Sequence, residues 1–291
     1  RERDRTEPAP CRSAGRTARL LSDPRVSGDV QFVGYDTGDP GLYVSDATGG
    51  SADSPTDCPD PVEFVPLDPG TELAYTLGER HCAGTITDGG HVPCSNPTAP
   101  HCPQHRSTWV CAKCTGTCLK DEMDCVEPHA IYLAAFAPDT FKVGVTKEWR
   151  LETRLREQGA DRGALLAVVP DGRIAREREA EIAAEISDRI RVPTKRAGLH
   201  RDVDADAWET LLEDFDVGDA DRYEFDYGLD LRDRPVAETV ATGTVHGVKG
   251  RLLVLDHAGS TYAVDLRDLV GYEATPEATT RDLQASLGAW G

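Results

Sequence analysis

Lysine and asparagine are scarce in this chain of 291 residues, although charge is not. Six lysines stand against 26 arginines, and asparagine occurs once, at Asn96. Asp and Glu total 51 and are spread over the whole length, which gives a net charge of −19. An acidic, lysine-poor composition resembles that of proteins from salt-loving archaea, where high salt screens the self-repulsion. We interpret the charge as halophilic adaptation, and it neither implies nor excludes a nucleic-acid partner.

Long apolar runs are absent as well. No segment approaches the roughly 20 apolar residues that a membrane helix needs, so we expect no membrane association. Residues 1–26 are rich in arginine and lack both an initiating Met and the apolar stretch of a signal peptide. We therefore expect a disordered tail and a cytoplasmic location, where structural disulfides are rare. The oligomeric state is left open.

Cysteine, in contrast, is concentrated in one region: seven of the nine lie between residues 82 and 125. The pairs Cys102-Pro-Gln-His105 and Cys111-Ala-Lys-Cys114 have the two-residue gap that lets both side chains of a tight turn reach one ion. Residues 81–128 contain little apolar surface, so bound metal would replace a core there. The sequence therefore predicts two closed, structural zinc sites made from eight ligands: Cys82, Cys94, Cys102, His105, Cys111, Cys114, Cys118 and Cys125.

The division of these ligands between two ions is open. A sequential assignment gives the first four to one zinc and the last four to the other, but the spacing alone also allows pairs that alternate between the two ions. His81, His91 or His101 could replace a cysteine. The competing hypothesis is a set of disulfides, which nine cysteines in a secreted protein would suggest, with one odd thiol. Cys11 and Cys58 lie far from the group and are expected to be free thiols.

The pattern of strands, helices and turns predicts an α+β protein with six segments. These are a tail at 1–26, an N-terminal β segment at 27–78, the zinc-binding module at 79–128, a β-β-α-β-α unit with a small antiparallel sheet at 129–196, an acidic connector at 197–235 and a small C-terminal β domain at 236–291. In the connector, Trp208, Leu211 and Leu212 suggest a short packed helix. The closely spaced C-terminal strands with glycine turns are typical of a small barrel, which the N-terminal strands could complete.

The unit at 129–196 carries three short motifs: Ile131-Tyr132-Leu133 on a first strand, Lys142-Val-Gly-Val-Thr146 on a second and Arg154-Leu155 on a helix. In this order of elements, the motifs resemble those of the GIY-YIG nuclease fold. Together with Cys125-x-x-Pro-His129 and Gln158-Gly-Ala, these motifs are also similar to an uncharacterised prokaryotic family that places a cysteine-rich module before such a domain. That second resemblance covers most of residues 28–275, and the first covers about 129–192.

A second helix is expected over 173–191. At 100° per residue, one apolar face carries Ala175, Ile182, Ala183, Ile186 and Ile190, with Glu179 in its middle. A carboxylate on a buried stripe is costly unless it is paired or holds a metal. The GIY-YIG resemblance implies that Glu179 coordinates a divalent ion, and the alternative is a pair with an arginine.

The resemblance implies phosphodiester hydrolysis, with roles for four residues. Glu179 would hold Mg²⁺, Tyr132 would orient or deprotonate the attacking water, and Arg154 (or Arg150) would neutralise the phosphate. Lys142 stands where the family often has a tyrosine, which removes one group that the nuclease mechanism uses. Each also has a structural alternative: Tyr132 as a core residue and Arg154 as a helix-surface ion-pair partner.

We therefore expect a protein that recognises RNA or DNA, with Mg²⁺-dependent cleavage as an open possibility. The alternative is a non-catalytic scaffold for protein interaction stabilised by structural zinc. Five further residues could contact nucleic acid: Trp109, Lys113 and Lys120 in the zinc module, and Lys249 and Arg251 in Gly247-Val-Lys-Gly-Arg. The alternative is that they are ordinary surface or turn residues.

Overall fold

The computed structural model describes residues 29–46, 59–106, 127–218 and 222–284. They form a nine-stranded sheet, a four-stranded sheet and a two-stranded hairpin, with five α-helices and one short 3-10 helix. The strands are β1 (Val30–Asp36), β2 (Gly41–Asp46), β3 (Val62–Pro66), β4 (Glu72–Arg80), β5 (Thr85–Thr87), β6 (Gly90–Val92), β7 (His129–Phe136), β8 (Thr140–Lys147), β9 (Arg162–Val169), β10 (Arg222–Glu224), β11 (Val236–Ala237), β12 (Ala241–Lys249), β13 (Leu252–His257), β14 (Ser260–Asp265) and β15 (Tyr272–Thr275). The helices are η2 (Glu148–Arg150), α1 (Leu151–Gln158), α2 (Gly172–Ile182), α3 (Val192–Ala197), α4 (Ala205–Asp214) and α5 (Leu266–Leu269). The fold is therefore a mixed α+β arrangement.

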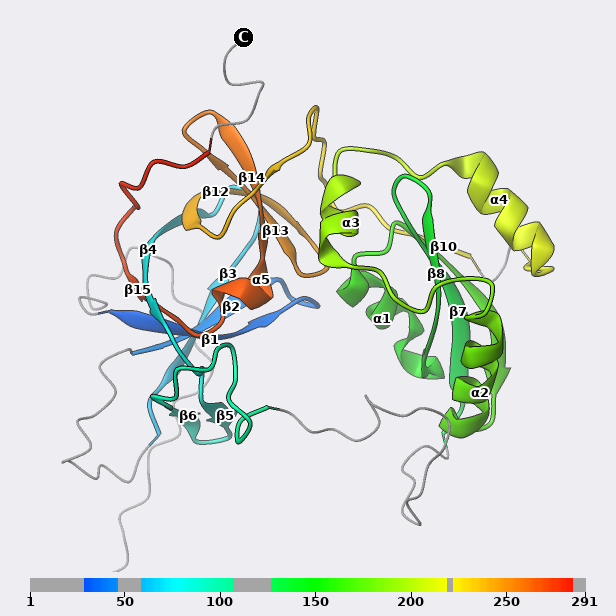
Figure 1. The fold of residues 1–291 in the computed structure, drawn as a ribbon, viewed down its shortest axis with the longest axis horizontal. Helices are drawn as coiled ribbons and strands as arrows, with labels where there is room; N and C mark the ends of the chain where they lie inside the picture. The colour runs from blue at the N-terminus through cyan, green and yellow to red at the C-terminus, as the bar shows by residue number, and fades with distance from the viewer. Residues whose placement is uncertain (1–28, 47–58, 107–126, 219–221, 285–291) are drawn as a thin grey trace, which may run out of the picture.

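The nine-stranded sheet joins the two ends of the described chain. Its order is β11-β14-β13-β12-β4-β15-β1-β2-β3, so the C-terminal strands form one side, the N-terminal strands form the other, and β4 and β15 are interleaved in the middle. β4 belongs to both halves, because its first residues pair with β12 and its last with β15. Side chains from β1 and β2 share one core with side chains from β13 and β14, so the sheet curls round on itself (Figure 1). The N-terminal strands thus complete the C-terminal β structure.

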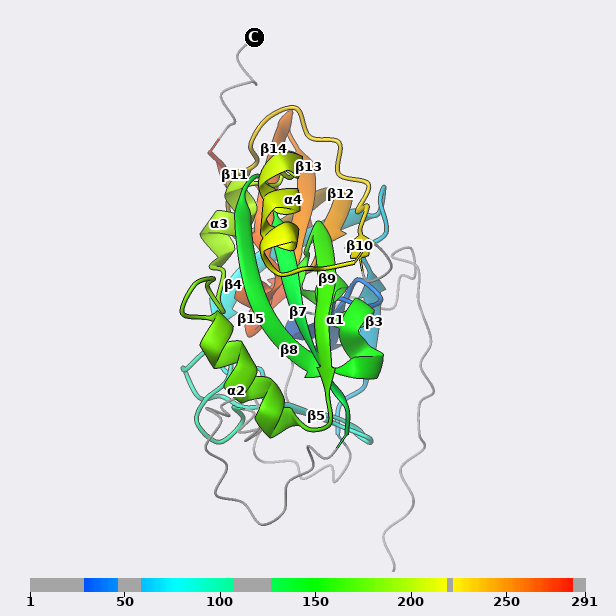
Figure 2. The ribbon, with the colours of Figure 1, turned by 90° about the vertical axis from the view of Figure 1, so that its right-hand side faces the viewer.

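The second sheet has the order β10-β9-β7-β8 and carries helices on both faces. Alternation along β7 puts Ile131 and Leu133 in a core with α2 and α4, and Tyr132 and Ala134 in a core with α1. Figures 1 and 2 show the result: α1 and α3 lie between the two sheets, while α2 and α4 cover the outer face. The element order from β7 to α2 is the expected β-β-α-β-α.

Local signals in the sequence explain where most helices of this unit begin and end. α1 ends at Gly159, whose φ of 69° is a left-handed conformation that glycine adopts without strain. The Asp171 carboxylate accepts a hydrogen bond from the Ile174 N–H at 2.8 Å and caps α2. Trp208 and Leu212 of α4 are buried against the sheet, and β10 adds a fourth strand beyond it. The α/β unit therefore extends past residue 196 into the acidic segment.

One expectation was wrong. The helix expected over 173–191 ends at Ile182, and the next residues form tight turns. The Ser187 carbonyl accepts a hydrogen bond from the Val143 N–H of β8 at 3.0 Å, at the free edge of the sheet. Ile186 then packs in the outer core and Ile190 in the inner core, so this segment wraps around the edge. Tertiary bonding at a sheet edge has overridden local helix propensity.

Among the described residues, no helix is long and apolar enough to cross a membrane.

Candidate functional site

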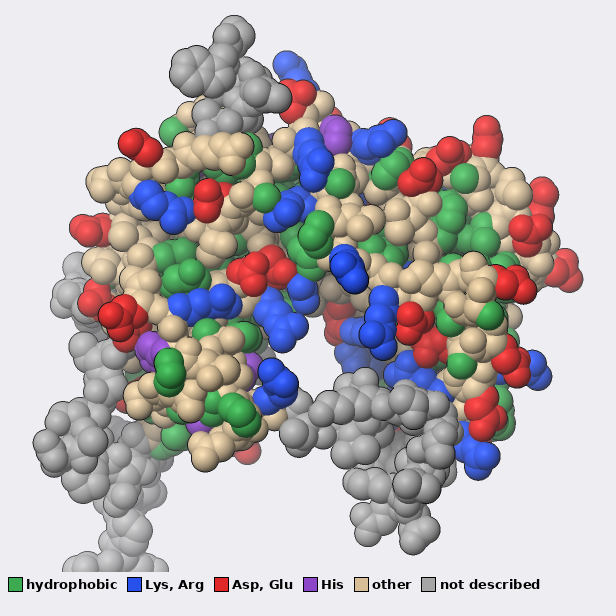
Figure 3. Space-filling view, in the orientation of Figure 1, with side chains coloured by type: hydrophobic (Ala, Val, Ile, Leu, Met, Phe, Trp, Pro, Cys, Tyr) green, Lys and Arg blue, Asp and Glu red, His purple; other side chains and the backbone are tan. Residues whose placement is uncertain are grey.

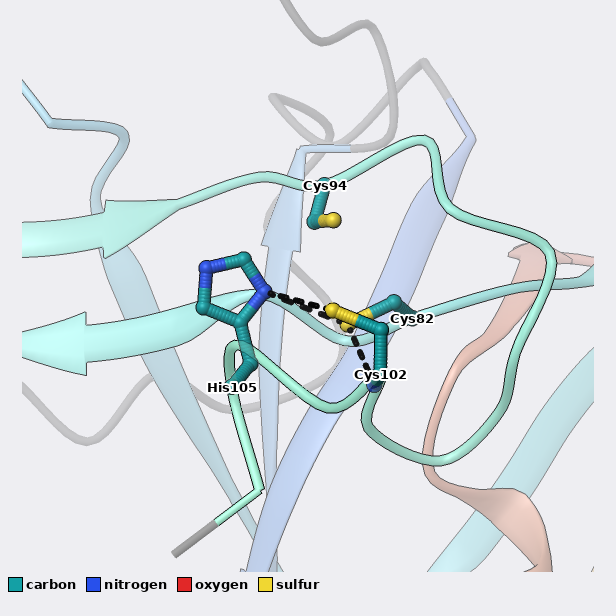
Figure 4. A group of neighbouring side chains, drawn as sticks. All are labelled: Cys82, Cys94, Cys102 and His105. Carbon is teal, nitrogen blue, oxygen red and sulfur yellow. Dashed lines mark hydrogen bonds between the residues drawn. The ribbon is translucent and has the colours of Figure 1, made fainter.

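Three cysteines and a histidine converge beside the end of β4. Cys82 follows β4, Cys94 follows β6, and Cys102 and His105 share one turn (Figure 4). One ligand atom from each of the four lies within 4.8 Å of the ligand atoms of the others. The first four of the eight predicted ligands are therefore together in space, in the sequential grouping.

The distances suit a bound cation. His105 Nδ1 lies 3.4 Å from the Sγ of Cys82 and 3.4 Å from the Sγ of Cys102. A tetrahedral ion with metal–sulfur bonds of about 2.3 Å and metal–nitrogen bonds of about 2.0 Å would separate sulfur from nitrogen by roughly 3.5 Å. Cys82, Cys94 and Cys102 are unbridged thiols. These residues can hold a metal ion.

The turn around Cys102 prepares it as a ligand. The N–H groups of His105 and Arg106 donate to the Cys102 carbonyl at 3.0 and 2.9 Å, which closes the two-residue gap. Although desolvation opposes ionisation of the Cys102 thiol, hydrogen bonds from the N–H groups of His105 and Gln104 lower its pKa to about 7. The pKa of the Cys82 thiol is raised by burial. A thiolate is the form that binds metal.

Neighbouring histidines fasten this group to the sheet. His81 Nδ1 lies 2.9 Å from the Cys94 carbonyl oxygen, and its Nε2 lies 3.1 Å from the Glu273 carboxylate on β15. The buried His91 donates through Nε2 to the Ala83 carbonyl at 3.0 Å. Neither belongs to the four-residue group, so both act as supports for the loops that carry the ligands. The second predicted ligand set, Cys111, Cys114, Cys118 and Cys125, lies outside the described residues, as do Cys11, Cys58, Trp109, Lys113 and Lys120.

A second cluster forms around Tyr132, on the face of the four-stranded sheet that meets α1. Tyr132 is 1% exposed, and its hydroxyl lies 2.5 Å from Gln158 Nε2 at the end of α1. It pairs across the strands with Gly144, where an added Cβ would lie 2.5 Å from the Tyr132 ring. The glycine of Lys142-Val-Gly-Val-Thr thus makes room for the tyrosine.

Two of the other predicted residues, Arg154 and Glu179, act electrostatically on both Tyr132 and Lys142. Burial raises the pKa of Tyr132, while the positive charge of Arg154 opposes the rise and the negative charge of Glu179 adds to it. Burial lowers the pKa of Lys142 to about 8, and the same two side chains act on it, Glu179 upward and Arg154 downward. Arg154 of α1 and Glu179 of α2 are therefore within electrostatic range of both Tyr132 of β7 and Lys142 of β8.

Two of these residues already have partners. Glu179, with 13% of its side chain exposed, accepts a hydrogen bond from Arg176 at 2.6 Å. The Arg154 side chain is 46% exposed, and its guanidinium lies 3.4 Å from Glu157, which also pairs with Arg150 at 2.7 Å. The carboxylate is thus paired with an arginine, whereas Arg154 is held loosely and remains accessible.

Comparison with known proteins adds one relationship. The family described as "Protein of unknown function (DUF2797)" matches residues 70–274, more than half of the chain. The chain belongs to this family. No curated protein and no solved structure matches it. The DUF2797 match begins just before β4 and reaches β15, so it takes in the metal-ligand group, the Tyr132 cluster and most of both sheets.

Sequence reasoning missed two residues at the Tyr132 cluster, and a third had only a weak signal. Lys195 of α3 and Arg176 of α2 have no local pattern that marks them, because their neighbours come from other elements. Lys195 lies near Lys142 and Arg154, and Arg176 near Lys142. Gln158, which bonds Tyr132, was noticed only as part of Gln158-Gly-Ala.

Proposed function

We propose that this chain is a zinc-containing protein that binds nucleic acid through a GIY-YIG-like domain. The observation that carries the proposal is that Arg154 and Glu179 lie close enough to both the buried Tyr132 and Lys142 for their charges to shift the pKa of each. The β-β-α-β-α order and the place of each residue within it support the likeness to the GIY-YIG fold. A lysine and an accessible arginine beside each other, in a chain of net charge −19, suit a phosphate group.

The two cations differ in what they offer to a phosphate. Arg154 has a planar fork of donors that can bind two phosphate oxygens, and Lys142 acts as a compact charge. Burial lowers the pKa of Lys142 to about 8, and a phosphate placed beside it would raise that pKa again. Phosphate binding should therefore favour the charged form of Lys142 and be coupled to proton uptake.

Mg²⁺-dependent phosphodiester hydrolysis is the second candidate, favoured by the position of Glu179 next to Tyr132 and Arg154. Glu179 would hold the ion, which would polarise a phosphoryl oxygen. Tyr132 would orient the attacking water and Arg154 would neutralise charge on the phosphate. In the structure, Arg176 occupies a Glu179 oxygen and Tyr132 is 1% exposed. Cleavage would require Arg176 to leave Glu179 and Tyr132 to become accessible to water, so binding is the better supported function.

We also propose that the metal is zinc, in two structural sites. Three thiolates and one imidazole, with no carboxylate, form a donor set that zinc prefers and that leaves no open position. Cys111, Cys114, Cys118 and Cys125 would supply the second site. Metal analysis of reduced protein should find two zinc ions per chain, with Cys102→Ser losing one and Cys114→Ser losing the other.

The test of the main proposal is binding of labelled DNA and RNA oligonucleotides, single-stranded and double-stranded, in KCl. Arg154→Ala and Lys142→Ala should each weaken binding, whereas Arg178→Ala should not. Arg178 is a matched control because it is 63% exposed and pairs with Glu181 on α2. Parent protein that is folded and zinc-loaded but binds none of the oligonucleotides would favour the protein-interaction scaffold instead.

Hydrolysis is tested separately with the same oligonucleotides and Mg²⁺. Glu179→Gln should abolish cleavage while leaving binding in place, and cleavage that survives this change would remove Glu179 from the mechanism. Arg176→Ala should raise the apparent affinity for Mg²⁺, because it frees the carboxylate. An unchanged Mg²⁺ dependence in Arg176→Ala would show that Glu179 is not the ligand.

A further inference from the structure

Lys195 of α3 lies at the junction of the two sheets, between α1 and the β12–β13 turn. Its Nζ donates a hydrogen bond to the Gln158 carbonyl at 2.7 Å and lies 4.5 Å from the centre of the Phe136 ring. These contacts hold the ammonium group in place at the end of α1. It lines a small cavity together with Gly159 and Leu252, which come from the two sides of the junction.

Four cations act on Lys195, and the acidic side chain of Asp161 lines the same cavity. Burial is the largest cause that lowers the pKa of Lys195, to about 7, and the positive charges of Lys142, Arg251, Arg154 and Lys249 lower it further. Lys249 is neutralised by Asp161, to which it is salt-bridged. Such a gathering of like charge is unfavourable unless an anion offsets it.

The junction is rigid enough to keep these cations together. Leu199, which follows α3, packs in one cluster with Leu252 and Val254 of β13. A Cβ added at Gly159 would lie 3.0 Å from the backbone of Lys249, so α1 and the β12–β13 turn are in close contact. The packing therefore holds the cations of the four-stranded sheet and its helices next to those of the nine-stranded sheet.

Arg251 has unused hydrogen-bonding capacity at this junction. Its Nη2 donates to Asp265 at 2.7 Å, and its side chain is 36% exposed. Its Nε is buried and has no hydrogen-bond partner within the part of the chain that the structure describes. That N–H is closed to solvent, so a phosphate would bind the exposed part of the Arg251 side chain, whose forked donors match phosphate oxygens.

Cations continue from Arg251 toward the metal-ligand group. Arg251 and Arg267 both lie near Tyr35, where their charges oppose the rise in its pKa that burial causes. The Arg267 carbonyl accepts a hydrogen bond from Arg80 at 3.2 Å, and Arg80 stands two residues before Cys82. In Figure 3, Lys and Arg side chains gather around the hollow between the two halves of the molecule, with a few acidic side chains beside them at its rim.

We propose that Lys195 and Arg251 form a second phosphate-binding site, across the junction of the two sheets, for the same nucleic-acid strand. The strand would run from Lys142 and Arg154, over Lys195 and Arg251, toward Arg267 and Arg80 beside the metal-ligand group. This inference rests on the proposed nucleic-acid binding and adds the path of the backbone. Lys195 and Arg251 are binding residues in it, and no chemical step is assigned to them.

The test is the dependence of affinity on KCl concentration, because the slope counts the phosphates that a protein neutralises. Labelled double-stranded DNA, or the preferred probe of the four, is titrated with parent, Lys195→Met and Arg251→Gln. Each variant should weaken binding at every salt concentration and reduce the slope of log affinity against log salt by about one. Met retains the apolar stem of Lys195, and Gln retains a donor at Arg251, so both should fold; circular dichroism and zinc content check this.

The outcomes separate the two proposals. A reduced slope in both variants, with Arg178→Ala equal to the parent, supports the junction site. Arg251→Lys should then retain the slope but bind more weakly than the parent, since it keeps the charge and loses the fork. If Arg154→Ala weakens binding while Lys195→Met and Arg251→Gln match the parent, the junction site is wrong and the proposed function stands. If the parent binds none of the four probes, both are wrong.

Discussion

At the scale of single residues, Gly144 shows how the motif around Lys142 depends on packing. An added methyl group at this position would lie 2.5 Å from the Tyr132 ring, which is fixed by Gln158 and 1% exposed. Gly144→Ala should therefore lower the free energy of unfolding by about 1–3 kcal/mol, the range for an overpacked core. Denaturant unfolding at fixed KCl measures this. Gly38→Ala is the control, because its Cβ would meet only Asp36 Oδ1 at 3.5 Å; equal effects of both changes would contradict the packing argument.

Lys195 should make both stability and binding depend on pH, in opposite directions. Its pKa is about 7 in the folded chain, below the ordinary lysine value of about 10.4 in the unfolded chain. Between these two values the unfolded state binds more protons, so the free energy of unfolding should rise as pH rises above about 7. Phosphate binding needs the charged amine, so affinity should fall over the same range.

Arginine at position 195 separates these effects, since it stays charged throughout the range. Lys195→Arg should bind nucleic acid with a weaker pH dependence between about pH 6 and pH 8. Lys142→Arg should instead weaken the pH dependence of affinity mainly above about pH 8. The charged groups around Lys195, namely Lys142, Arg154, Asp161, Lys249 and Arg251, are unchanged in the first variant. Identical affinity–pH curves for parent and Lys195→Arg would exclude Lys195 from the phosphate site.

At the scale of elements, local signals in the sequence predict this structure well wherever a turn or cap decides it. Gly159 ends α1, the Ala137-Pro-Asp-Thr turn separates β7 from β8, and the two-residue gap of Cys102 and His105 closes on one site. Non-local partners were not predictable in the same way. The end of α2 at Ile182 depends on the free edge of β8, and the neighbours of β4 come from residues 241–244 and 272–275, far along the chain. Lys195 joins the Tyr132 cluster only through such a contact.

The segment after α2 gives a prediction of its own. The Ser187 carbonyl accepts a hydrogen bond from the Val143 N–H at the edge of β8, and Ile186 packs that segment into the outer core. Ile186→Ala should destabilise this contact by roughly 1 kcal/mol, because the side chain is half-buried, and so speed exchange of the Val143 amide about fivefold. Hydrogen exchange measures the rate. Glu185→Ala changes an exposed neighbour and should leave it unaltered; equal rates in both variants would mean that the segment does not protect the edge.

At the scale of the whole molecule, net charge and nucleic-acid binding make opposite demands on salt. A charge of −19 favours unfolding through self-repulsion, which salt screens as the Debye length falls from about 10 Å at 0.1 M to about 3 Å at 1 M. The thermal midpoint should therefore rise with KCl. Sucrose at equal osmolality also favours the compact state but does not screen charge, so it should give a smaller rise. Equal rises in both solutes would show that screening is not the cause.

Phosphate binding should weaken over the same KCl range, because salt reduces the gain from counterion release. The fraction of protein that captures an oligonucleotide is the product of the folded fraction and the affinity of the folded chain. The first factor rises with KCl and the second falls, so capture should pass through a maximum at intermediate KCl. Arg251→Gln and Lys195→Met should move the maximum to higher salt. Both variants make the affinity of the folded chain fall less steeply with KCl, and both leave the net charge almost unchanged. Fluorescence anisotropy, with circular dichroism on the same samples, separates the two factors, and capture that rises without limit as KCl is lowered would contradict the halophilic interpretation.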